Sequence, residues 1–137
     1  MSTLFSGRTI LKVATLLFGL CAAIWIILEG QLWRAVGMGT FAAALLIGSL
    51  LSRLVLDRRL SRIQIVAVCS LAGLLFGFGS GFFTLSAMTI KTGLHGHGPE
   101  FTREQISWVV HQMPRWSLAG LVGGLGSAGV FLSFREQ

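Results

Sequence analysis

The sequence predicts an all-α membrane protein, a four-transmembrane-helix bundle of up-down topology with a short amphipathic interfacial helix between its third and fourth spans. Of its 137 residues 53% are hydrophobic and 12% charged, and the mean hydropathy is +0.77. Soluble domains carry about a quarter charged residues. Four apolar runs approach the roughly 20 residues that a helix needs to cross a bilayer core. The basic residues lie between these runs or near their ends, a distribution that is typical of membrane proteins.

The four spans are expected to form a single domain covering residues 1–137. The first run continues through Leu28, beyond the apolar region of a normal signal peptide, and is therefore interpreted as an uncleaved anchor. The third contains no charged residue and is long for an untilted span, so it tilts or its last turn leaves the hydrocarbon. The predicted spans are residues 10–28, 35–56, 63–90 and 116–134.

The distribution of basic residues predicts an orientation. Cytoplasmic segments of membrane proteins carry an excess of Lys and Arg. This positive-inside rule favours cytoplasmic termini, with the segment 91–116 on the opposite face, where Trp33, Trp108 and Trp116 fall at the membrane boundary. One side holds Arg8, Lys12, Arg53, Arg58, Arg59, Arg62 and Arg135, against Arg34, Lys91, Arg103 and Arg115 on the other.

Glycines spaced four residues apart predict close packing of the third and fourth spans. Membrane helices associate where small residues let two backbones approach. The sequence "GLLFGFGSG" and the sequence "GLVGGLGSAG" supply GxxxG pairs in these two spans. The candidate helix-packing residues are Gly73, Gly77, Gly81, Gly120 and Gly124.

The segment between the third and fourth spans holds most of the polar chemistry. Thr102 and Gln105 have the spacing of a capping box and start an expected helix at about 103–113. Its apolar residues recur at intervals of three and four, which gives one apolar stripe. Pro114 is expected to end or kink this helix. Eleven residues are too few to span, so the helix is expected to lie at the interface or to cap the bundle.

All three histidines lie in this same segment. His and carboxylate side chains are ligands for zinc, copper and nickel. A divalent metal site formed by His95, His97, Glu104 and His111 is one hypothesis. The alternatives are that the imidazoles are merely solvated or hydrogen-bonded groups on a glycine-rich loop, or that they form a pH-responsive contact.

Other functional patterns are sparse. The spans have no acidic residue in their interior, and the chain has no CxxC, HExxH or GxSxG motif, so we expect neither an enzyme nor a proton-coupled carrier. Basic residues are not gathered as nucleic-acid binding requires. Ser80 and Thr84 share a helix face and could line a polar path, or could bond back to the helix backbone. Arg58, Arg59 and Arg62 could bind lipid head groups, or could serve only to fix the topology.

These observations favour a small non-enzymatic membrane protein that acts as an accessory or assembly component of a membrane complex. Its expected partners are the lipid bilayer and other membrane proteins or further copies of the chain, without nucleic acid and without an organic cofactor. A small oligomeric channel or carrier is the alternative, and a metal binder on the outer face is the third hypothesis.

Overall fold

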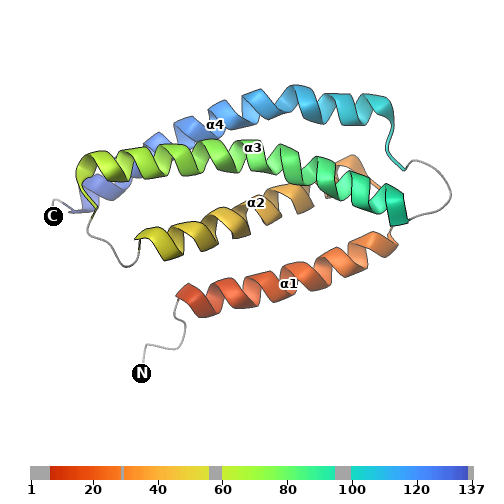
Figure 1. Ribbon diagram of the computed structural model, residues 1–137, viewed down its shortest axis with the longest axis horizontal. Coiled ribbons are helices and arrows are strands. Elements are labelled where there is room, and N and C mark those ends of the chain that lie inside the picture. Colours follow the sequence, from red (N-terminus) through yellow and green to blue (C-terminus); the bar gives the residue numbers. More distant parts are fainter. Residues whose placement is uncertain (1–6, 29, 56–59, 95–99, 136–137) are drawn as a thin grey trace.

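The computed structural model describes residues 7–28, 30–55, 60–94 and 100–135, and all its regular structure in this part of the chain is helical. The four helices are α1 (Gly7–Ile27), α2 (Leu32–Val55), α3 (Arg62–Leu94) and α4 (Arg103–Arg135) (Figure 1). Each is long and apolar enough to cross a membrane. The chain is therefore an integral membrane protein by length and composition.

Consecutive helices run in opposite directions along one row, in which α3 lies between α2 and α4 (Figure 1). Among consecutive helices, the contact is most extensive between α3 and α4, smaller between α2 and α3, and smallest between α1 and α2. We call the end where α1 begins and α4 ends the terminal end. The opposite end, where α1 ends and α4 begins, is the loop end.

Capping boxes start both of the longer helices. At α3 the backbone N–H of Ser61 donates to Gln64 Oε1 at 2.9 Å, and the N–H of Gln64 donates to Ser61 Oγ at 3.3 Å. At α4 the matching distances between Thr102 and Gln105 are 2.9 and 3.2 Å. Each box satisfies backbone N–H groups that the first turn of a helix leaves free. The capping box predicted at Thr102 is thus confirmed, whereas the one at Ser61 was not foreseen.

The fourth helix is continuous through Pro114, which corrects the expected boundary at this residue. Instead of a short interfacial helix over 103–113 and a separate span, one helix of 33 residues extends from Arg103 to Arg135. Proline removes one helical hydrogen bond, but membrane helices tolerate it where neighbouring groups support the backbone. Here α3 packs against α4 on both sides of Pro114, with Gly81 against Met113 and Gly77 against Trp116.

Glycine lets α3 and α4 meet backbone to backbone. A Cβ atom added at Gly73 would collide with the Gly120 carbonyl, and one added at Gly120 would collide with the Gly73 carbonyl. The same holds for Gly77 against the Trp116 carbonyl and for Gly124 against the carbonyl of Cys69. No side chain larger than hydrogen fits at these positions without a shift of the helices.

The contact between α2 and α3 also uses small residues. A Cβ atom at Gly39 would collide with Thr84, whose side chain is fully buried. One turn further along α2, Ala43 is 1% exposed, and its Cβ atom would lie 3.5 Å from a Cβ atom added at Gly79. The row is therefore held together by close approaches on both sides of α3.

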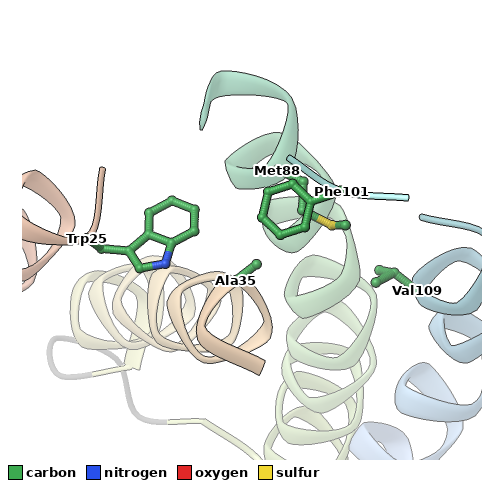
Figure 2. Close-up of a cluster of buried hydrophobic side chains, with 5 residues drawn as sticks. All are labelled: Trp25, Ala35, Met88, Phe101 and Val109. Carbon is green, nitrogen blue, oxygen red and sulfur yellow. The ribbon is translucent and has the colours of Figure 1, made fainter. Parts of the chain in front are cut away.

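The buried hydrophobic cluster lies at the loop end. Its members are Trp25 of α1, Ala35 of α2, Met88 of α3, Phe101 just before α4, and Val109 of α4 (Figure 2). Because every helix contributes to it, all four are joined at this end.

Replacement of Gly77 by Ala should destabilise the protein, because its Cβ would meet the Trp116 carbonyl and force α3 away from α4. Overpacking of this kind costs about 1–3 kcal/mol. Thermal unfolding in detergent measures the effect. Gly126→Ala is the matched control, since a Cβ there has nothing within 4 Å and alanine favours a helix. Equal melting temperatures for the two variants would contradict this account of the packing.

Candidate functional site

The most unusual polar residue of the structure is Lys91, in the last turn of α3. Its side chain is 0% exposed, although lysine is almost never fully buried without partners. It lies next to the hydrophobic cluster at the loop end, one turn beyond Met88. A charge in such a place needs partners that replace water.

The C-terminus of α1 supplies these partners. Lys91 Nζ donates to the carbonyl oxygens of Trp25 at 3.0 Å and Ile26 at 3.1 Å, and also to the carbonyl of Leu28. The last four carbonyls of a helix have no partner within the helix and carry its negative dipole end. An ammonium group with three donors therefore suits this position. The contact joins residues more than 60 positions apart in the sequence.

Two further groups complete the surroundings of Lys91. Glu100 Oε2 lies 3.5 Å from Nζ, and the Trp25 ring centroid lies 4.8 Å from it. The carboxylate balances the charge, and the indole face attracts the cation. A Cβ at Gly30 would collide with Glu100, so glycine at this position gives the carboxylate its room.

Sequence reasoning missed the role of Lys91, which it used only as a basic residue at the end of the third span. That span was expected to end at residue 90, but α3 continues to Leu94 and carries Lys91 inward. Two signals were present: a helix end with free carbonyls after the first apolar run, and one acidic residue, Glu100, shortly after the lysine.

A groove runs between α2 and α4 over α3, with a volume of about 850 Å³. We call it the α2–α4 groove. Most of its floor is made of small residues, so the backbones of α3 and α4 are close to its surface. Its lining includes Val36, Thr40 and Ile47 of α2, Ala72, Gly73 and Phe76 of α3, and Ala119, Gly120 and Gly123 of α4.

Three tryptophans flank the loop end of the α2–α4 groove. The rings of Trp33 and Trp108 have centroids 5.4 Å apart, and those of Trp108 and Trp116 have centroids 6.0 Å apart, both at interplanar angles of 75°. Edge-to-face pairs of this kind contribute about 0.5–1.5 kcal/mol each. They link α2 to α4 across the groove.

The hydroxyl groups of the predicted polar path bond to the backbone of α3. Ser80 Oγ donates to the Phe76 carbonyl at 2.8 Å and Thr84 Oγ1 to the Ser80 carbonyl at 2.6 Å. Ser80 lines the α2–α4 groove, whereas Thr84 packs against Gly39. The structure therefore does not bring these two residues to one open surface.

The predicted metal ligands are only partly described. Glu104 and His111 are exposed residues of α4, and His95 and His97 lie outside the described residues. His111 Nδ1 is 2.7 Å from the carbonyl oxygen of Ser107, one turn earlier in the helix. Within the described ranges, no three His, Cys, Asp or Glu residues are placed to share a metal ion. The metal site stays a prediction.

Of the predicted lipid head-group residues, Arg62 begins α3 and is exposed. Arg58 and Arg59 lie outside the described residues. The predicted helix-packing glycines lie where α3 meets α4, and the contribution of the GxxxG pairs to assembly stays a prediction.

Replacement of Lys91 by Met should lower stability strongly, because it keeps an unbranched side chain but leaves Glu100 and the carbonyls of α1 without their cation. Loss of one partner of a buried ion pair costs about 3–5 kcal/mol. Thermal unfolding in detergent provides the measurement, with the exposed Arg103→Met as the control. A Lys91→Met protein as stable as the control would show that Lys91 does not hold α1.

Comparison of the chain with models of protein families, with curated proteins and with solved structures finds no match.

Proposed function

We propose that the chain is a non-enzymatic accessory or assembly component of a membrane complex, and that it holds a transmembrane helix of a partner protein in the α2–α4 groove. The observation that carries this proposal is the length of the groove, measured along the helix axes. It extends from Trp33 to Leu51 along α2 and from Trp108 to Ser127 along α4. At 1.5 Å per residue both distances are about 27–29 Å. This is close to the roughly 30 Å thickness of a bilayer core, which is the length of a transmembrane helix.

The surface of the groove also suits a helix. Helices in a membrane gain stability from close backbone approach and from hydrogen bonds between helices. A Cβ at Gly123 would have nothing within 4 Å, so this part of α4 is open to a neighbour. Thr40, Gln112 and Ser127 add hydrogen-bonding groups to an otherwise apolar lining.

A small oligomeric channel or carrier is the alternative function, and it needs a continuous polar path. The hydroxyls of α3 offer little support for one, since Ser80, Thr84, Ser86 and Thr89 each donate to the carbonyl four residues earlier. The accessory function requires no such path.

We also propose that the terminal end of the row is cytoplasmic and the loop end lies on the opposite face. Seven of the eleven Lys and Arg residues lie on the proposed cytoplasmic side, as counted along the sequence. The three tryptophans at the loop end of the α2–α4 groove are residues that favour the membrane interface.

This orientation predicts which engineered cysteines an impermeant maleimide reaches in intact cells. In a background with Cys21 and Cys69 replaced by Ala, Glu104→Cys at the loop end should react directly. Ser61→Cys at the terminal end should react only after the membrane is permeabilised. Both positions are exposed. The reverse pattern would overturn the orientation.

Filling the α2–α4 groove should release a partner held there. Gly123→Leu places a side chain in open space within the groove, so the fold should persist while the partner is lost. Gly126→Leu is the matched control: it is three residues further along α4, also has open space, and is not part of the groove lining. The measurement is quantitative co-purification from native membranes in mild detergent.

We expect wild type and Gly126→Leu to retain the same partner in fixed proportion and Gly123→Leu to lose at least nine-tenths of it. Retention of that partner by Gly123→Leu would rule out the groove as its binding site. A homo-oligomer without any partner, giving substrate-dependent flux in liposomes, would instead support the carrier.

A further inference from the structure

The first helix packs against the rest of the molecule mainly at one end. At the loop end Lys91 binds the carbonyls of Trp25 and Ile26, and Trp25 belongs to the hydrophobic cluster. Taken over their whole length, α1 and α2 have the smallest contact of any two neighbouring helices. Towards the terminal end a cleft of about 720 Å³ lies between them, which we call the α1–α2 cleft.

The α1–α2 cleft is apolar along its length and basic at one end. Its apolar lining includes Leu11, Phe18, Ala42 and Leu45. Two basic residues, Lys12 of α1 and Arg53 of α2, also line it. Because α1 and α2 run in opposite directions, the early position of Lys12 and the late position of Arg53 both fall towards the terminal end (Figure 1).

These two basic side chains are not neutralised by the part of the chain that the structure describes. Both are exposed, and neither forms an ion pair with a described acidic residue. Thr15 and Ser49 lie near them in the cleft, but their hydroxyls donate to the carbonyls of Leu11 and Leu46. The cleft therefore carries two basic side chains at the terminal end of a largely apolar surface.

Measured along α2, the depth of the α1–α2 cleft is close to one leaflet of a bilayer. The lining residues of α2 extend from Arg53 to Ala42. These two residues are eleven positions apart, or about 16 Å along the helix. Half of a bilayer core is about 15 Å. At the deep end the ring of Phe18 stacks on that of Phe41, with centroids 5.6 Å apart. A transmembrane helix would need twice this depth, whereas an acyl chain from one leaflet does not.

We infer that the α1–α2 cleft binds an anionic phospholipid, with an acyl chain between α1 and α2 and the phosphate between Lys12 and Arg53. Arginine binds phosphate through its planar fork and lysine binds it as a point charge. Long basic side chains also reach from the apolar region to the head-group level. This inference does not depend on the proposed partner helix, because the cleft and the α2–α4 groove have no lining residue in common.

Native mass spectrometry of the purified full chain tests the inference, with titration of phosphatidylglycerol and of phosphatidylcholine carrying the same acyl chains. We expect the wild type to bind phosphatidylglycerol at least tenfold more tightly than phosphatidylcholine. Lys12→Gln and Arg53→Gln should each weaken this binding about fivefold, since one basic residue near the surface contributes about 1 kcal/mol. Arg53→Lys should retain most of the affinity.

Two controls separate the cleft from general attraction to a positive surface. Arg62→Gln removes one charge at the same end of the molecule but outside the cleft. Ser49→Phe should fill the cleft and abolish binding, while Ser133→Phe, an exposed serine of α4 with the same type of backbone hydrogen bond, should not. Equal affinity for both lipids, or equal losses in Arg62→Gln and Arg53→Gln, would overturn the inference. So would unchanged binding by folded Ser49→Phe.

Discussion

The attachment of α1 to the other helices depends on one interaction above all, the binding of its carbonyl end by the Lys91 ammonium. Without it α1 would be held by Trp25 in the hydrophobic cluster and by limited packing against α2. The Lys91 ammonium also forms an ion pair with Glu100, and this pair holds the segment before α4 close to the end of α1. A fully buried charge is costly in isolation, but here it is surrounded by the acceptors that a helix end must satisfy in any case.

Two lateral surfaces follow from this arrangement. The cluster at the loop end gathers all four helices, while glycine contacts fix α3 against α4 along their length. The α2–α4 groove and the α1–α2 cleft lie on opposite sides of α2 and differ in depth and in charge. The first matches the whole thickness of a bilayer core and the second a single leaflet, which is why different occupants are assigned to them.

Much of the helical framework was predictable, because hydropathy and glycine spacing are local properties of the sequence. The first three spans were expected within a few residues of α1, α2 and α3, and the Thr102 capping box followed from its spacing alone. The fourth was expected to begin at residue 116, whereas α4 begins at Arg103. The site around Lys91 was not predictable in this way, since the carbonyl groups that it binds in α1 are more than 60 residues away. Pro114 was misjudged because local rules end a helix at proline, whereas contacts with α3 on both sides of it keep α4 continuous.

The same proline has a consequence for the depth of the protein in the bilayer. Because Pro114 has no N–H, the Val110 carbonyl takes no helical hydrogen bond from it, and Val110 and Pro114 both lie on an exposed part of α4. Such an oxygen needs water or head groups, since a lone acceptor in hydrocarbon costs several kcal/mol. We therefore expect the level of Val110 to lie at one edge of the hydrocarbon, close to Trp108, whose indole favours the membrane interface. From Val110 to Arg135 α4 is about 37 Å long, enough to reach the opposite edge.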